Sequence, residues 1–500
     1  MRIRLLIILL LIKANVNAQF TNMNWALGDS CGIHFSSTGV DSLYQTAVNA
    51  RGSCAAISDS AGKLLFYAAS PDLELYNMPL LIENGRIYNK QHQTMENGDT
   101  ISCSNWYHEM MILPWPDSLQ KFAVIHSMAT SGARISYSVV DMSYNNGLGK
   151  VVTKNNVLSY GNICDGMTAI RHGNGRDWWI LFRKWWATTN FFYKILLTPQ
   201  GFSGVTTQQI GKPVNSSNYS LVAALDGENI IGIGGIGDSV IERFSFDRCT
   251  GVLSNHQIIY NGDNQPVVVC WEGALSASGR FLYLSSFWTP PSMLYQIDLQ
   301  DSLAWNHKVV IDSIDTLTTV SAALRLAPNG KIYRSDWWCE SLMQCYPFAD
   351  TAYSPLNTHL SVINEPDSAG LACNYTGLSQ HLGGYRTYLG LPNCVNLSLG
   401  AKTGSACDTL SIGITEAPEA IPLKVYPNPS QQVVTVELPF KPTANGVIYQ
   451  LTDPLGRIVK EGLFKYVSNE LWLNNLPSGL YFLHITTNKM KYQARLIRNK

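Results

Sequence analysis

The stretch Ala55-Ala-Ile-Ser-Asp-Ser-Ala-Gly-Lys-Leu-Leu-Phe-Tyr67 contains the unit that decides the fold. It begins with a short apolar segment, passes through small residues that include Gly62, and ends in a second apolar segment that closes on an aromatic residue. Small polar residues and glycine favour tight turns, and aromatic residues favour strands. The stretch therefore predicts a β-hairpin.

Similar units recur along the chain from about residue 50 to residue 350, and almost no segment between them has helical periodicity. Their starts lie about 45 to 60 residues apart, the length of a four-stranded propeller blade with long loops. We predict an all-β fold with a β-propeller over residues 19–400, of seven blades, with six to eight left open. A seventh blade would combine the strand Gly32-Ile-His-Phe35 with strands from residues 360–395. The further copies are Met110–Leu113 with Lys121–Ile125, Thr168–Leu181, Leu221–Ile233, Gly273–Leu284 and Ala323–Tyr333.

Several strings of this body resemble the WD40-like propeller regions of secreted Bacteroidota proteins. They are Ile57–Tyr67, Val140-Asp-Met142 followed by Gly147–Val151, Leu326–Tyr333, Leu360–Pro366 and Gly390-Leu-Pro-Asn393. The chain departs from that pattern at Cys394, where related chains often carry an aromatic residue, and in its Trp-rich insertions. The resemblance implies a fold and a location outside the cell, and it implies no catalysed reaction.

The last eighty residues contain four sequence blocks in a fixed order: Val425–Pro429, Leu451–Gly462, Leu476–Leu483 and Lys491–Lys500. Together they resemble the type A sorting domain of the type IX secretion system of Bacteroidota. Alternating apolar and polar residues predict short strands here, and hence a small Ig-like β-sandwich over residues 421–500 behind a linker at residues 401–420. The alternative is an ordinary Ig-like binding module. The motif residues are Pro427, Asn428, Pro429, Asp453, Gly456, Gly479, Tyr481, Lys491 and Lys500.

That resemblance implies export across the outer membrane by the type IX machinery, usually followed by removal of the tail by its sortase-like peptidase. The other end of the chain agrees, because residues 1–18 have the basic and apolar regions of a signal peptide, with cleavage between Ala18 and Gln19. No later stretch is long and apolar enough to predict a transmembrane segment. We expect a protein that passes through the periplasm and is secreted or anchored at the outer cell surface.

Bulk composition excludes some partners. Charged residues make up 14% of the chain and the formal net charge is zero, which argues against a nucleic acid partner.

The eleven cysteines are an odd number, which would leave one thiol free or paired outside the chain. Sequence proximity suggests three disulfides, although spacing cannot settle connectivity: Cys31–Cys54, Cys339–Cys345 and Cys373–Cys394. Neither these cysteines nor the histidines have metal-ligand spacing, so we predict no metal site and no cofactor.

No nucleophile motif occurs in the sequence, and we therefore predict no catalytic residue and no enzyme activity. The leading hypothesis is a non-enzymatic propeller that presents a binding surface to a protein or glycan. One alternative is a carbohydrate-active enzyme, a glycosidase or lyase, since a pair of carboxylates can meet in space without any sequence spacing. The acids to examine are Glu109, Glu272, Asp336 and Glu340. A structural adhesin is the other alternative.

Three Trp pairs lie within or beside predicted strands: Trp178 and Trp179, Trp185 and Trp186, and Trp337 and Trp338. Side chains alternate along a strand, so each pair is expected to leave one ring at a face, a blade interface or the rim. Exposed aromatic rings can stack on sugars and peptides, which makes these residues candidates for a binding rim. The alternative is that the rings pack between blades.

Asp followed by Ser or Thr and then an apolar residue or Thr occurs eleven times. Average amino-acid usage would give about two such triplets. The triplet resembles the O-glycosylation acceptor of Bacteroidota, although Asp-Ser and Asp-Thr are also good turn formers. The acceptor hydroxyls would be those of Ser42, Ser60, Thr100, Ser118, Ser239, Ser302, Ser313, Thr316, Thr351, Ser368 and Thr409.

Overall fold

The chain divides into two compact units, residues 1–410 and residues 411–500. The computed structural model describes residues 20–50, 52–70, 85–104, 108–128, 132–185, 190–235, 238–261, 270–286, 291–314, 319–338, 353–408, 421–443, 446–453, 457–487 and 491–499.

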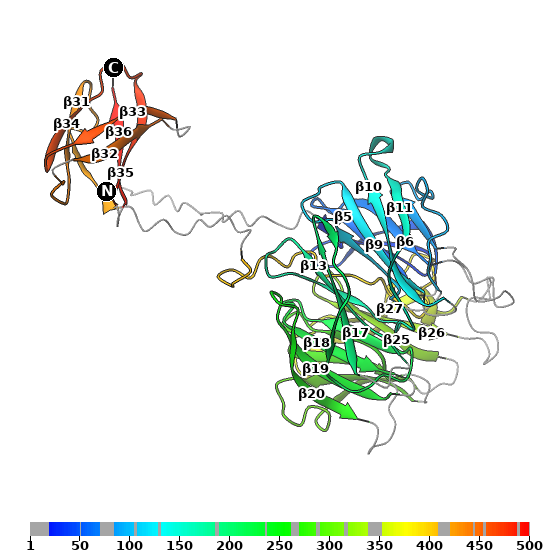
Figure 1. Cartoon of the computed structure of the whole chain (residues 1–500). Coiled ribbons are helices and arrows are strands. Elements are labelled where there is room, and N and C mark those ends of the chain that lie inside the picture. The colour runs from blue at the N-terminus through cyan, green and yellow to red at the C-terminus, as the bar shows by residue number, and fades with distance from the viewer. Residues whose placement is uncertain are drawn as a thin grey trace, which may run out of the picture. The chain divides into compact units, whose positions relative to one another are not determined.

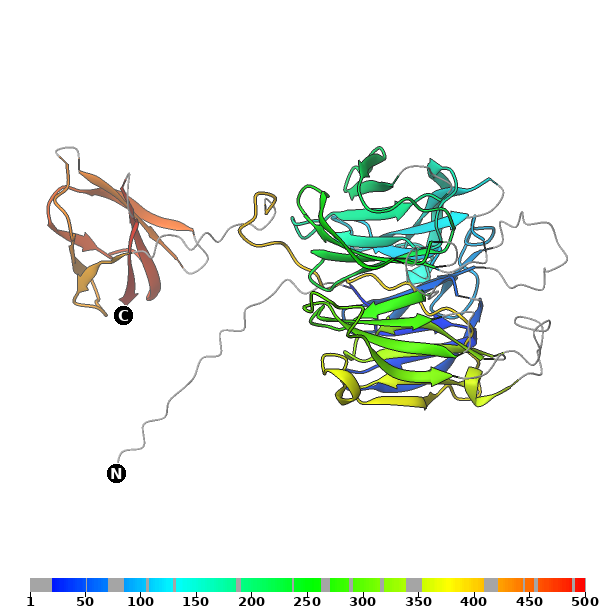
Figure 2. The ribbon, with the colours of Figure 1, turned by 90° about the horizontal axis from the view of Figure 1, so that it is seen from below.

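The first unit is a β-propeller of seven sheets, as predicted, and its successive sheets are seen in Figures 1 and 2. The first three, in chain order, contain β2 (Asn24–Leu27), β3 (Asp29–Phe35) and β4 (Val40–Asn49); β5 (Cys54–Asp59), β6 (Leu64–Ala69) and β7 (Arg86–Asn89), joined by β1 (Phe20–Thr21); and β8 (Met110–Pro114), β9 (Lys121–Met128), β10 (Arg134–Asp141) and β11 (Lys150–Tyr160). A short 3-10 turn, Asn145–Gly147, lies between β10 and β11.

The remaining four sheets follow the same plan, with strands added in sequence order. They contain β12 (Thr168–Arg171), β13 (Trp178–Arg183), β14 (Phe191–Thr198), β15 (Gly201–Phe202) and β16 (Thr206–Gln209); β17 (Tyr219–Ala223), β18 (Asn229–Gly234), β19 (Val240–Phe246) and β20 (Leu253–Asn261); β21 (Cys270–Leu275), β22 (Phe281–Ser286), β23 (Ser292–Asp298) and β24 (Val309–Ile314); and β25 (Thr319–Leu326), β26 (Ile332–Trp338), β27 (His359–Ile363) and β28 (Tyr375–His381). Two short helical turns connect strands of the last sheet: α1 (Pro355–Thr358) precedes β27, and the 3-10 turn Gly370–Cys373 precedes β28.

All six copies read from the sequence form the first hairpin of a sheet, and the turn of the first copy shows why. Asp59 Oδ1 accepts hydrogen bonds of 2.9 Å from the backbone N–H groups of Ala61 and Lys63, which stabilises the reversal between β5 and β6. Gly62 completes that reversal at φ +79°, and Gly330 does the same in the last copy at φ +78°. Only glycine adopts this left-handed conformation without strain, so the small-residue turn in the sequence correctly located each hairpin.

Hydrophobic clusters between neighbouring sheets close the ring. Four clusters connect the sheets from β5 through β28 in succession. A fifth joins the last sheet to the N-terminal sheet β2–β4 and to the sheet of β5. At this closure Trp25 and Phe35 lie edge-on to Tyr333, at centroid distances of 5.8 and 5.4 Å. Each sheet thus buries both faces against its neighbours, which one sheet alone could not do.

The prediction of a composite seventh blade is wrong. Residues 32–35 pair within β2–β4, and that sheet has three strands, all from residues 24–49. The strands from residues 359–381 are the third and fourth strands of the last sheet instead. A single bridge, between Asp29 and Arg386, connects the N-terminal sheet to the later segment. The ring is therefore closed by side-chain packing between two whole sheets rather than by a shared sheet.

Residues 391–408, which we call the strap, follow the last sheet and cross the propeller unit toward the hairpin that contains Cys249 (Figure 2). Their backbone contacts several sheets in turn, through bonds from Asn393 N to Cys54 O and from Lys402 N to Gly173 O. Cys407 forms a disulfide with Cys249, which follows β19. The strap is therefore part of the propeller unit, and the predicted linker over residues 401–420 is wrong for residues 401–408.

The disulfide between Cys249 and Cys407 spans 158 residues of sequence. A cross-link over so long a loop stabilises a protein by restricting its unfolded chain, typically by about 2–4 kcal/mol. Replacing both residues by serine should lower the free energy of unfolding by about that amount, measured by denaturant titration of the oxidised protein. Dithiothreitol should destabilise the parent and leave the double variant unchanged; equal stability of the two oxidised proteins would contradict the expectation.

The second unit is a β-sandwich, as predicted, with one core between its two sheets. In β31, Val434 and Val436 are buried while their neighbours are half-exposed, as the alternating pattern in the sequence required. One sheet contains β29 (Ile421–Pro422), β32 (Val447–Thr452), β33 (Ile458–Phe464), β35 (Gly479–Thr486) and β36 (Lys491–Arg498), and the other contains β30 (Lys424–Tyr426), β31 (Val433–Glu437) and β34 (Ser468–Trp472).

Candidate functional site: a cavity at the ring centre

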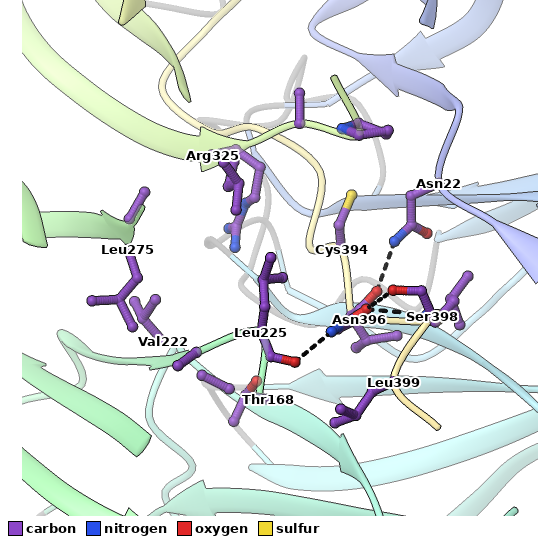
Figure 3. A pocket seen from close by; sticks show the side chains of 18 of the residues that line it. Asn22, Thr168, Val222, Leu225, Leu275, Arg325, Cys394, Asn396, Ser398 and Leu399 are labelled. Carbon is purple, nitrogen blue, oxygen red and sulfur yellow. Dashed lines mark hydrogen bonds between the residues drawn. The ribbon is translucent and has the colours of Figure 1, made fainter. Parts of the chain in front are cut away.

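A cavity of about 600 Å³ lies at the centre of the propeller (Figure 3). The first strands of four sheets, β12, β17, β21 and β25, and the turns that follow them form much of its wall. Residues 20–25 and strap residues 393–399 form the rest. The strand order of a propeller places the first strand of each sheet nearest the axis, which brings residues from distant parts of the sequence to one cavity.

Polar side chains attach the strap to the cavity wall without a regular strand ladder. Asn22 Nδ2 donates to the Val395 carbonyl at 2.7 Å, and Asn396 Nδ2 donates to the Leu225 carbonyl at 2.7 Å (Figure 3). Val395 and Leu397 turn into the surrounding core, and Ser398 is exposed. The strap is thus bound much as an extended peptide would be, by amide side chains and alternating apolar contacts.

Arg325 from β25 points into the cavity and forms a buried ion pair beside it (Figure 3). Its Nη2 lies 2.7 Å from Glu272 Oε1, and His108 Nε2 lies 2.9 Å from the same oxygen. The Glu272 side chain is only 2% exposed. Arg325 Nη2 also lies 2.8 Å from His108 Nε2, so that nitrogen accepts from Arg325 in one tautomer and donates to Glu272 in the other. The charge of Glu272 is offset by Arg325.

Two thiols lie near this ion pair, Cys54 fully buried and Cys394 partly buried. Burial raises the pKa of Cys394 to about 11, although Arg325 acts in the opposite direction. Burial also raises the pKa of Cys54 well above its usual value, and the nearby Cys394 adds to that effect. Both sulfurs are therefore protonated at neutral pH, and neither is an activated nucleophile.

The acids considered for glycosidase chemistry do not converge on the cavity. Glu109 and Asp336 are buried, and neither lines it. Asp336 Oδ1 lies 2.9 Å from Arg334 Nε, and Arg334 Nη1 lies 2.8 Å from Asp312 Oδ2. Burial raises the pKa of Asp336; the charge of Arg334 lowers the pKa of Asp312 in spite of its partial burial. Glu340 lies outside the described residues.

Trp178 and Trp179 alternate as expected, but neither ring forms an exposed rim. Trp178 is 1% exposed and packs in the cluster of its own sheet and the two preceding ones. The Trp179 ring packs toward the next sheet, and its Nε1 donates to the Arg248 carbonyl at 3.0 Å. The rim prediction is therefore wrong for Trp178, because each ring fills a different interface between sheets. Trp185 is half-buried against the Trp179 cluster; Trp186 and the side chains of Trp337 and Trp338 lie outside the description.

The disulfide predictions for Cys31–Cys54 and Cys373–Cys394 are wrong. All four of these cysteines are free, and Cys31, Cys54 and Cys373 are buried. Sequence proximity failed because Cys31 and Cys54 lie in strands of different sheets, and Cys373 and Cys394 lie in a 3-10 turn and in the strap. The observed partners are instead brought together by the path of the strap. Cys339 and Cys345 lie outside the described residues. Three further cysteines, Cys103, Cys164 and Cys270, are also buried.

The candidate glycosylation serines and threonines that the structure describes lie mostly on the surface. Ser239 is buried, Ser118 and Ser368 are half-buried, and Thr316, Thr351 and Thr409 lie outside the described residues. Turn formation explains part of the pattern, since Asp301 Oδ1 accepts from Leu303 N at 2.8 Å. The exposed acceptors are Ser42, Ser60, Thr100, Ser302 and Ser313.

O-glycosylation remains a prediction with a direct test. The intact mass of the protein purified from its natural host should exceed that of the unmodified chain. Ser60→Ala should remove the mass of one glycan because Ser60 is exposed at the turn of the first hairpin. Ser239→Ala is the matched control and should change nothing beyond the missing oxygen. A native mass equal to that of the bare polypeptide would rule the modification out.

The tail motif residues make structural contacts within the sandwich. Asn428 Nδ2 donates to the Arg495 carbonyl and its Oδ1 accepts from Ile497 N, which joins the loop before β31 to the last strand. Pro427 and Pro429 flank it, each after a cis peptide bond. Asp453 accepts two bonds from Arg457, and Tyr481 donates to Pro477 O at 2.6 Å. Gly479 and Lys491 begin β35 and β36; Gly456 and Lys500, like Ala18 and Gln19, lie outside the described residues.

Sequence reasoning missed the arginines of the cavity wall, Arg171 and Arg325. Each is a single charged residue in an inner strand that is otherwise apolar or small, and this pattern could have singled them out.

Within the described residues, no group of three or more His, Cys, Asp or Glu side chains is placed to hold a metal ion. No helix in the described part of the chain is long and apolar enough to cross a membrane.

These features define a class: an exported β-propeller protein with a C-terminal sorting module. Residues 424–499 match the family described as the secretion system C-terminal sorting domain. The chain therefore carries a type IX sorting domain, which directs secretion across the outer membrane to the cell surface or medium and implies handling by the type IX machinery. A comparison with curated proteins found no match.

Solved structures similar to this chain are distant in sequence. A putative 6-phosphogluconolactonase from Bacteroides uniformis is 11% identical, with 74% of this chain and 98% of that one covered and a TM-score of 0.43. The periplasmic gluconolactonase PpgL of Pseudomonas aeruginosa is 10% identical, covering 75% and 99%, with a TM-score of 0.42. The β-propeller domain of Cps50 (Swd1) from Myceliophteria thermophila is 10% identical, covering 64% and 90%, with a TM-score of 0.40. At this identity the likeness concerns the fold alone.

Proposed function

We propose that the protein is a non-enzymatic binding protein of the cell exterior, whose ring presents a surface to a protein or glycan. The observation that carries the proposal is the burial and ion pairing of Glu272, the acid beside the cavity. Glu272 is buried and its charge is offset by Arg325, so it is poorly suited to take a proton from a sugar or water. A glycosidase needs two carboxylates flanking one bond, one of them protonated and the other ionised.

Asp312 and Asp336, two described acids that lie close together, do not meet that need. Asp312 and Asp336 have pKa values displaced in opposite directions, which is the pattern expected for an acid and base pair. However, Arg334 forms ion pairs with both, and neither residue lines the cavity. Their arrangement favours an ion-pair network that joins β24 to β26 within the core.

The test combines binding and turnover on the same preparation. Full-length protein should bind a subset of a glycan array or capture a discrete partner from surface extracts of its own host. It should release no product from the glycans that it binds, measured by mass spectrometry after overnight incubation. Turnover that Asp336→Asn or Glu272→Gln abolishes would overturn the proposal in favour of the carbohydrate-active enzyme.

The structural adhesin differs from this proposal in how strongly a single copy binds. A ligand-specific ring should bind in monovalent format with a saturable isotherm. An adhesin should bind measurably only when many copies are displayed on a bead or vesicle, because weak sites gain from multivalency. Comparing the two formats decides between them.

A further inference from the structure

The cavity has an unbalanced charge inventory. Of the described residues that line it, only Arg171 and Arg325 carry a permanent charge, and none is an acid. Arg325 is paired with Glu272, as described above. The charge that remains is that of Arg171.

Among the described residues, the side chain of Arg171, at the end of β12, donates only to uncharged groups, while its backbone carbonyl accepts from Arg248 Nε at 2.9 Å. Its Nη1 donates to the Gly175 carbonyl at 3.1 Å, and its Nη2 donates to the Leu397 carbonyl of the strap at 3.3 Å. The guanidinium carbon lies 4.2 Å from the centroid of the Trp178 ring. Among the described residues, its buried Nε has no acceptor. Five donors therefore meet two acceptors, both uncharged.

The electrostatic surroundings of Arg171 also indicate a positive charge without a matching negative one. Burial, helped by the neighbouring charge of Arg248, lowers the pKa of Arg171 to about 10. Arg171 is still protonated at neutral pH, so a positive charge is held in a partly desolvated site without a carboxylate. Such a charge is costly unless it is paired, and an anion supplied by a ligand would offset that cost.

Apolar side chains form much of the wall around this charge. Ile170, Leu221, Val222, Leu275 and Leu399 all line the cavity. Its volume of about 600 Å³ falls within the range of small-molecule sites. A ligand that suits this lining has one negative group and an apolar body. A doubly charged anion suits it less, because the second arginine is already neutralised by Glu272.

We propose that the cavity binds a small organic monocarboxylate. The carboxylate lies against the Arg171 guanidinium, whose planar donors match it, and the apolar body lies among the leucines of the first strands. The strap forms one wall of this site, since Leu397 both accepts from Arg171 and belongs to the lining. This proposal concerns the cavity alone and does not depend on the proposed binding of a protein or glycan.

The test uses full-length protein and three eight-carbon probes that differ only in the head group: octanoate, 1-octanol and octylamine. Octanoate should raise the melting temperature in a concentration-dependent way and bind by calorimetry at least tenfold more tightly than octanol. Octylamine should not bind. Equal binding of octanoate and octanol by the parent protein would overturn the proposal without any variant.

Three variants assign the effect to the charge of Arg171. Arg171→Met should weaken octanoate binding at least tenfold and leave octanol binding unchanged. Arg171→Lys keeps a positive charge and should retain most of the preference for octanoate, which covers the case in which the methionine variant does not fold. Arg280→Met, which removes an exposed arginine outside the cavity, is the matched control and should bind like the parent. Undiminished octanoate binding by Arg171→Met would contradict the proposal.

The outcome is independent of the proposed function. Glycan or protein binding that persists while octanoate fails to bind would reject the monocarboxylate site alone. Hydrolysis of a glycan together with selective octanoate binding would reject the non-enzymatic role alone.

Discussion

Deletion of residues 421–500 should leave the propeller inside the cell envelope instead of outside it. The reason is that the sorting module forms a separate unit with its own core, so its removal takes away the export signal and does not expose the core of the ring. Immunoblots of periplasmic, surface and medium fractions measure the effect. We expect the full-length protein at the surface or in the medium and nearly all of the truncated protein in the periplasm.

Two controls separate export from folding. The truncated protein, purified from the periplasm, should melt at the same temperature as the ring in the full-length protein, since the two units have separate hydrophobic clusters. Asn428→Ala removes the two side-chain bonds from Asn428 to β36 and leaves the backbone bond from Ser430 N to the Ile497 carbonyl, so it should reduce export only in part. Normal delivery of the truncated protein to the outside would show that the C-terminal module is dispensable.

Arg325→Met should lower the free energy of unfolding by about 3–5 kcal/mol, because breaking a buried ion pair leaves the partner charged and unpaired. The partner here is Glu272, which would keep only the hydrogen bond from His108. Chemical denaturation of parent and variant at neutral pH measures the loss.

A matched arginine and a double variant test this explanation. Arg280 pairs with Asp298 at 2.6 Å on the surface, and Arg280→Met should cost less than about 1 kcal/mol, as exposed pairs do. Adding Glu272→Gln to Arg325→Met should restore part of the stability by removing the unpaired charge. If the double variant is less stable than Arg325→Met, the penalty has a different origin, such as lost packing in the cavity wall.

The hairpins, the two-unit organisation and the export signal were predictable because their determinants are local. The turn from Asp59 to Gly62 contains its own acceptor and its own left-handed residue, so it specifies a hairpin with no help from distant residues. Alternation in Val433–Glu437 likewise indicated which side chains of the sandwich are buried. The charged residues of the cavity were not predicted, because their roles depend on partners from β21 and from the strap.

Local sequence determined the first hairpin of six sheets, the glycine turns within them and the sorting module in residues 424–499. Tertiary structure alone decided how the ring closes, which cysteines pair, and that residues 393–399 line its central cavity. The physical reason is distance along the chain. Cys249 and Cys407 are 158 residues apart in sequence, and Trp25 and Tyr333 come from the first and the last sheet of the ring. No short-range pattern encodes such contacts, because they arise only when seven sheets bury their faces against one another.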